Sequence, residues 1–133
     1  MKNNNVCVVI LAGGLSLRMG GGIKSLKKFN KRNIIERILE RIKPQANYIL
    51  INSNEEKIFN KYNFPVIKDK IAGYLGPLAG IHASLNWIKK NIPHVEWLVT
   101  IPGDTPFLPK NLISKLFNKA KNHNIILITC KFT

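Results

Sequence analysis

Short, continuous apolar runs alternate along the chain with segments whose apolar residues recur at helical spacing. Continuous runs are typical of strands that a parallel sheet buries on both faces, and the helical spacing indicates amphipathic helices. The runs predict strands over Val6–Leu11, Tyr48–Ile51, Pro65–Ile67, Trp97–Ile101 and Ile125–Thr129. The intervening helices are expected over Asn33–Lys43, a short stretch with Ile58, Phe59 and Tyr62, Pro77–Lys90 and Lys110–Lys121.

Local chemistry predicts where some of these helices begin, end and pack. Pro44 ends the first helix because it cannot continue the backbone hydrogen bonds. Asn54 is expected to cap the short second helix with its side chain. The third helix carries four apolar residues on one face: Leu78, Ile81, Leu85 and Ile88.

Strands that alternate with helices imply right-handed βαβ units and a mostly parallel sheet covered on both faces. The expected fold is therefore α/β, a Rossmann-like doubly wound sheet. Because no linker, repeat or low-complexity segment interrupts the pattern, residues 1–133 are expected to form a single domain.

The connection between the first strand and the first helix, Ala12 to Arg32, is unusually long. Ordinary connections of this kind take about 2–6 residues, and much longer ones usually carry function. This one is rich in glycine, which lets backbone N–H groups approach a phosphate, and it contains the cations Arg18 and Lys24. It matches neither GxxxxGK[ST] nor GxGxxG. A phosphate cradle is the favoured interpretation, and a flexible structural loop is the alternative.

Polar residues follow the other predicted strands at their carboxyl ends. Asn52, Asp69 and Asp104 each come just after a strand, and the two aspartates are the only ones in the chain. In a parallel sheet these ends share one edge, where ligands bind. A carboxylate there suits Mg²⁺, which takes one or two carboxylates plus substrate phosphates. An Asx turn before Pro106 is the structural alternative for Asp104.

The segment Gly73–Gly80 opens the third helix, with Pro77 at the first helical position. Exposed N–H groups at such a start can bind an anion. Plain helix initiation explains the same residues, and both interpretations stay open.

Composition narrows the class of partner. The chain has 133 residues, 45% of them hydrophobic, and a formal charge of +14. The lysines are scattered rather than gathered in a stripe with aromatic residues, which favours phosphorylated small molecules over a nucleic acid. We expect no membrane-spanning segment and no secretory signal, and therefore a cytoplasmic protein. Cys7 and Cys130 lie in separate apolar runs and are expected to be buried free thiols.

Three blocks of residues together resemble the molybdenum cofactor guanylyltransferases. They are Leu11–Gly20 with Lys24 beyond it, Gly76–Gly80 (GPLAG) and Gly103–Leu108 (GDTPFL). The blocks occur in the family's order, and the resemblance covers essentially the whole chain. Ile23 and Gly73 depart from the pattern, because the family usually has acidic residues there. Related enzymes also continue beyond the position of Thr133, so the resemblance implies a domain that is cut short and lacks its C-terminal elements.

The resemblance implies a nucleotidyltransferase that transfers GMP from GTP to molybdopterin, with Mg²⁺ as cofactor. Contacts with proteins of molybdoenzyme maturation are also implied. The implied nucleotide-binding residues are Leu11, Ala12, Gly13, Lys24, Asn52, Asp69 and Asp104. Lys24 and Arg18 would stabilise the triphosphate charge, and Asp104 would hold the metal and so belong, with those two cations, to the catalytic set. The alternatives are a different base or acceptor, or a nucleotide-binding remnant without catalysis.

Overall fold

The computed structural model describes residues 3–13, 28–29, 32–70 and 77–123. Its elements, in chain order, are β1 (Asn3–Leu11), β2 (Lys28–Phe29), β3 (Arg32–Asn33), α1 (Ile34–Ile42), β4 (Ala46–Asn52), α2 (Glu56–Phe59), the 3₁₀ turn η3 (Asn60–Tyr62), β5 (Val66–Ile67), α3 (Pro77–Asn91), β6 (Trp97–Pro102) and α4 (Leu112–His123). The first four predicted strands and all four predicted helices are present. The fifth predicted strand, Ile125–Thr129, lies outside the described residues.

The described strands form a four-stranded sheet in the order β5-β4-β1-β6, and every pair in it is parallel. Strand β1 is central, because Cys7 pairs with Tyr48 on one side and with Leu98 on the other. Along the chain, β4 and β5 are added to the sheet on one side of β1, and β6 is then added on the other side. This arrangement confirms the predicted Rossmann-like α/β class.

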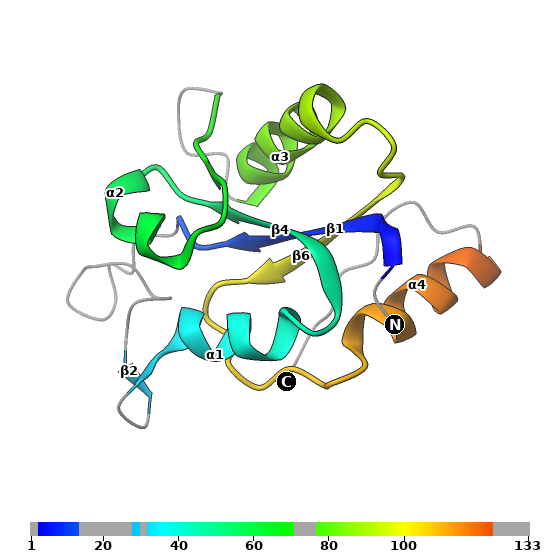
Figure 1. Ribbon diagram of the computed structural model, residues 1–133, viewed down its shortest axis with the longest axis horizontal. Helices are drawn as coiled ribbons and strands as arrows, with labels where there is room; N and C mark the ends of the chain where they lie inside the picture. Colours follow the sequence, from blue (N-terminus) through cyan, green and yellow to red (C-terminus); the bar gives the residue numbers. More distant parts are fainter. Residues whose placement is uncertain (1–2, 14–27, 30–31, 71–76, 124–133) are drawn as a thin grey trace.

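Helices cover both faces of the sheet (Figure 1). Along β1, Val6, Val8 and Ile10 pack on the face covered by α1, α2 and α4, while Cys7 and Val9 pack on the face covered by α3. Because successive side chains of a strand point to opposite faces, a strand buried on both sides needs an unbroken apolar sequence. The apolar run Val6–Leu11 is such an unbroken sequence.

Cys7 is a buried free thiol, as predicted. Burial disfavours the thiolate and raises the pKa of Cys7 to about 12. Cys130, the other predicted free thiol, lies outside the described residues. None of the described helices is long and apolar enough to cross a membrane.

The apolar face that the sequence indicates for α3 is buried only in part: Ile88 is buried and Ile81 half-buried, whereas the two leucines are not. Leu78 and Leu85 are 67% and 51% exposed. The buried residues of this helix are mostly small: Ala79, Gly80, Ala83, Ser84 and Ile88. Small side chains let the helix lie close to the sheet, so the contact selects the small face and turns the leucines outward.

The expected capping role of Asn54 is also wrong. Glu55 occupies the N-cap position of α2, and no side chain caps it within the described residues. The side chain of Asn54 instead accepts a hydrogen bond from the backbone N–H of Asp69 at 3.0 Å. A tertiary contact has therefore taken the acceptor that a local cap would use.

The long connection after β1 contains a small element that the apolar pattern did not indicate. Strands β2 and β3 pair as a short antiparallel ladder, with Lys28 opposite Asn33 and Phe29 opposite Arg32. Two-residue strands are too short to show a periodic pattern, so the sequence predicted only a loop here.

Gln45 ties the turn after α1 to the start of α4. Its amide nitrogen donates to the carbonyl oxygens of Arg41 (2.9 Å) and Pro109 (3.0 Å). Its amide oxygen accepts from the backbone N–H of Ile113, in the first turn of α4, at 3.0 Å. One side chain thus satisfies backbone groups of two helices that cover the same face of the sheet.

We predict that Gln45→Ala lowers the free energy of unfolding by about 1–2 kcal/mol, because it leaves part-buried backbone groups without partners. Urea-induced unfolding of the whole chain measures this. Asn118→Ala, at an exposed position of α4, is the control and should change stability by less than about 0.5 kcal/mol. Equal stability of the two variants would contradict the bridging role of Gln45.

Candidate functional site

The carboxyl ends of the parallel strands are joined to one another by backbone hydrogen bonds. The N–H of Ala12 donates to the carbonyl of Asn52 at 2.9 Å, and the N–H of Gly103 donates to the carbonyl of Leu11 at 2.9 Å. On the other side, the N–H of Ser53 donates to the carbonyl of Ile67 at 3.0 Å. The residues after the four strands therefore lie along one edge of the sheet, as the sequence predicted.

Asn52 is the buried polar centre of this edge, with only 6% of its surface exposed. Its amide nitrogen donates to the carbonyl of Ile67 at 3.0 Å and to Oδ1 of Asp69 at 2.9 Å. Because both partners are acceptors, the NH₂ group must face them, which orients the amide. The Oδ1 atom of Asn52 then lies toward Gly80 and Gly13.

Gly80 lies in the first turn of α3, directly against the Asn52 amide. A Cβ built on Gly80 would overlap Oδ1 of Asn52 and lie 2.7 Å from its Cγ. The start of α3 can approach the end of β4 this closely only because residue 80 has no side chain. The GPLAG block therefore has a packing reason in addition to helix initiation, and it brings the amino end of α3 to the candidate site.

Gly103 has a similar role at the end of β6. A Cβ built there would lie 2.7 Å from the carbonyl oxygen of Leu11 and 3.0 Å from Cα of Ala12. The next turn is closed by the hydroxyl of Thr105, which donates to the carbonyl of Pro102 at 3.0 Å. Asp104 lies between these two contacts and is exposed.

The two aspartates follow the two outermost strands of the described sheet. Asp69 follows β5 and Asp104 follows β6, with β4 and β1 between them. The carboxylate of Asp69 reaches toward β4, where it accepts a hydrogen bond from the Asn52 amide at 2.9 Å. Asp104 directly follows Gly103, whose N–H donates to the carbonyl of Leu11, so Asp104 is the aspartate next to the end of β1.

The donor set around Asp104 fits only a metal that the substrate helps to bind. Among the described residues, no group of three or more His, Cys, Asp or Glu side chains gathers. Mg²⁺ does not need such a cage, because it usually keeps waters and takes one or two carboxylates plus phosphate oxygens. An exposed carboxylate beside the end of the central strand suits that arrangement.

Most of the predicted site residues that can be located lie together. Leu11, Ala12 and Gly13 lie beside Asn52, and Asn52 is bonded to Asp69. Asp104 is the next residue after Gly103, which contacts Leu11. Arg18, Lys24 and the rest of the glycine-rich segment lie outside the described residues. The roles of all these residues toward a nucleotide stay predictions.

Sequence reasoning missed two residues that shape this edge. Gly80 was assigned only to helix initiation or anion contact, and its contact with Asn52 was not foreseen. Asn54 was assigned to a helix cap, although its partner is Asp69. The one available signal was its position two residues beyond Asn52, just past the end of a strand.

A cavity of about 460 Å³ lies elsewhere, between the turn after α1 and the start of α4, lined by Pro44, Gln45, Lys110 and Phe117 among others. Gln45 directly precedes β4, so this cavity is at the amino end of that strand. It is separate from the carboxyl edge of the sheet and has no part in the candidate site.

A family model described as the MobA-like NTP transferase domain matches residues 8–132. The chain belongs to this family. The match covers β1 from Val8 onward, the other strands of the parallel sheet and all the predicted site residues.

Curated relatives of this NTP transferase chain are named molybdenum cofactor guanylyltransferase. The protein of that name from Rhodopseudomonas palustris (strain BisB5) is 42% identical over 109 residues, which is 81% of this chain and 52% of the relative. The one from Yersinia pseudotuberculosis (serotype O:1b) is 42% identical over 118 residues, 88% of this chain and 58% of the relative. The chain thus spans little more than half the length of these relatives.

A solved structure supports the same grouping. The crystal structure of molybdopterin-guanine dinucleotide biosynthesis protein A from Archaeoglobus fulgidus superposes with a TM-score of 0.68 at 26% identity. The superposition covers 92% of this chain and 56% of that one. The fold of this family member is therefore that of the nucleotidyltransferases.

We predict that Gly80→Ala destabilises this NTP transferase domain by about 1–2 kcal/mol. Overpacking costs about 1–3 kcal/mol, which outweighs the gain of up to about 1 kcal/mol that alanine brings to a helix. Urea-induced unfolding measures the change. In an Asn52→Ala background the overlapping amide is gone, and the cost should shrink. Stabilisation by Gly80→Ala in the unaltered background would contradict the close contact.

Proposed function

We propose that this chain binds GTP at the carboxyl edge of its parallel sheet and serves the transfer of GMP from GTP to molybdopterin. The observation that carries the proposal is the joining of Leu11, Ala12, Asn52 and Asp69 at that edge, in a chain of the MobA-like NTP transferase family. The names of the curated relatives support the guanine base and the molybdenum cofactor as acceptor.

The sheet order supports a nucleotide at this place. Strands β4 and β5 lie on one side of β1 and β6 lies on the other, so the connections diverge at the end of β1. Divergence of this kind opens a crevice outside the strand ends, where open α/β sheets bind ligands. Leu11, Ala12 and Gly13 would offer backbone groups to the nucleotide there, because they lie at the opening.

The remaining residues have proposed roles on either side of that crevice. Asn52 and Asp69 offer an oriented amide and a carboxylate, which suit hydrogen bonding to a nucleoside. Arg18 and Lys24 would neutralise the triphosphate, where charge builds up during the reaction. Asp104 would hold Mg²⁺, which when bound would neutralise further phosphate charge.

The proposed reaction is a substitution at the α-phosphorus of GTP. A phosphate oxygen of molybdopterin attacks that phosphorus, and the bond to the oxygen bridging the α- and β-phosphates breaks. The products are the guanine dinucleotide of molybdopterin and pyrophosphate, which keeps the electron pair of the broken bond. The protein's contribution would be positioning and charge neutralisation, which are the main needs of phosphoryl chemistry.

Calorimetric titration of the 133-residue chain with GTP and Mg²⁺ tests the proposal, with CTP and ATP as controls. We expect binding that depends on Mg²⁺ and favours GTP. Pyrophosphate release on addition of molybdopterin then tests transfer itself. Tighter binding of CTP or ATP than of GTP would favour another base, and equal affinity for all three would contradict selection of guanine. GTP binding without transfer would favour a nucleotide-binding role alone.

We predict that Asp104→Ala removes the Mg²⁺-dependent part of GTP affinity, because the substitution deletes the proposed metal ligand. Titrations with Mg²⁺ and with EDTA compare the two conditions. Asp104→Asn keeps the size of the side chain and should lose most of the same part. An unchanged Mg²⁺ dependence in both variants would contradict the metal assignment.

We predict that Lys24→Ala weakens the binding of GTP more than the binding of GMP, by about ten-fold in the ratio of the two affinities. The reason is that the ammonium group is proposed to meet the distal phosphates, which GMP lacks. Competition titrations with both nucleotides give the ratio, and Lys119→Ala on α4 serves as the control. An equal loss for GTP and GMP would place Lys24 elsewhere on the nucleotide.

A further inference from the structure

The backbone hydrogen bonds that pair β4 with β5 end just before Asp69, which the proposed nucleotide site needs. The N–H of Ile51 donates to the carbonyl of Pro65 at 2.9 Å, and the N–H of Ser53 donates to the carbonyl of Ile67 at 3.0 Å. Strand β5 ends at Ile67, so Asp69 lies beyond the last ladder bond. The sheet alone therefore does not hold Asp69.

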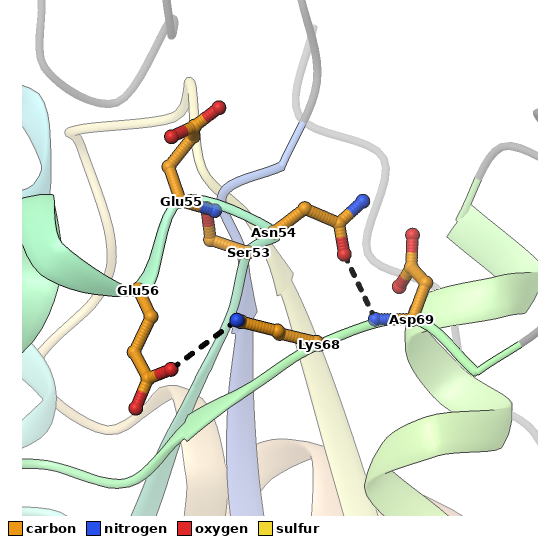
Figure 2. Close-up of polar contacts among 6 residues, drawn as sticks. All are labelled: Ser53, Asn54, Glu55, Glu56, Lys68 and Asp69. Carbon is orange, nitrogen blue, oxygen red and sulfur yellow. Dashed lines mark hydrogen bonds and ion pairs between the residues drawn. The ribbon is translucent and has the colours of Figure 1, made fainter.

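A side chain takes the place of the next ladder bond. With the same alternation continued, the N–H of Asp69 would donate to the backbone carbonyl of Ser53. The acceptor is instead Oδ1 of Asn54, at 3.0 Å. Figure 2 shows the Asn54 side chain reaching from the end of β4 to the backbone nitrogen of Asp69.

Two asparagines thus hold Asp69 at two different points. Asn54 accepts from its backbone N–H, and Asn52 donates to its carboxylate at 2.9 Å. The bond from the backbone N–H to Asn54 fixes the position of the Asp69 main chain, and the bond from Asn52 fixes the position of its carboxylate. Loss of the first would leave Asp69 on an extended segment with only its carboxylate tethered.

An ion pair between Glu56 and Lys68 also joins the segments after β4 and β5, but it is weaker. Nζ of Lys68 lies 3.4 Å from Oε2 of Glu56, and the two side chains are 58% and 50% exposed (Figure 2). Exposed ion pairs contribute little, because water and salt screen them. This pair also leaves the Asp69 backbone untouched, so it cannot replace the bond from Asn54.

We propose that Asn54 is a positioning residue of the nucleotide site, which holds the backbone of Asp69 so that its carboxylate meets the bound nucleoside. This inference rests on the proposed function, because it takes Asp69 to contact GTP. Asn54 acts through Asp69 and need not touch the nucleotide itself.

Amide exchange tests the contact without any nucleotide. In the 133-residue chain, Asn54→Ala should speed hydrogen exchange of the Asp69 amide by about ten-fold, because its acceptor is removed. Asn54→Asp keeps an acceptor at the same place and should retain the protection. Unchanged exchange in Asn54→Ala would overturn the inference at its first step.

A double-mutant cycle tests the role. Asn54→Ala should weaken Mg²⁺–GTP binding by roughly five-fold in the unaltered chain and by less than about two-fold when Asp69 is already alanine. A merely structural role would give the same loss in both backgrounds, and that result would overturn the proposal. Glu56→Gln, which breaks the neighbouring exposed bridge, is the matched control and should change affinity by less than about two-fold.

The same titrations separate this inference from the proposed function. If the unaltered chain binds GTP and Asn54→Ala binds it equally well, the role of Asn54 is wrong and the proposed function stands. If the folded, unaltered chain binds no GTP, the proposed function is overturned, and the role of Asn54 is overturned with it. Circular dichroism melting of each variant establishes that the compared chains are folded.

Discussion

Strand β1 pairs in parallel with a neighbour on each side, and the pairing continues past its last residue. The N–H of Ala12 reaches the end of β4, and the carbonyl of Leu11 receives the N–H of Gly103 at the end of β6. Parallel pairing forces all these ends to the same edge of the sheet. Every other feature of the candidate site, including the packing of α3 and the tethering of Asp69, is built on that common edge.

Much of the fold could be predicted because its strands are buried on both faces. The apolar run from Val6 to Ile10 has no polar interruption, and such runs between amphipathic helices leave little choice but a covered parallel sheet. From that topology the positions of Asn52, Asp69 and Asp104 on one edge followed directly. The residues alone indicated phosphate and metal binding, and the family resemblance added the nucleotide and the acceptor.

The contacts within the edge could not be predicted in the same way. Leu78 and Leu85 have the spacing of a buried face, yet the close approach of α3 to β4 selects the face with Gly80 and Ala83. Asn54 suits a local cap, yet a residue far along the chain competes for its oxygen. Periodicity and capping preferences describe neighbours in sequence, whereas these outcomes depend on which groups the tertiary fold brings together.

The contact between Gly80 and Asn52 also constrains how this protein can evolve. The helix residue has no space for a methyl group while the strand residue keeps its amide where it is. A change at either position therefore alters which side chains the other can accept without overlap, so a methyl group at residue 80 becomes possible once the amide at residue 52 is lost.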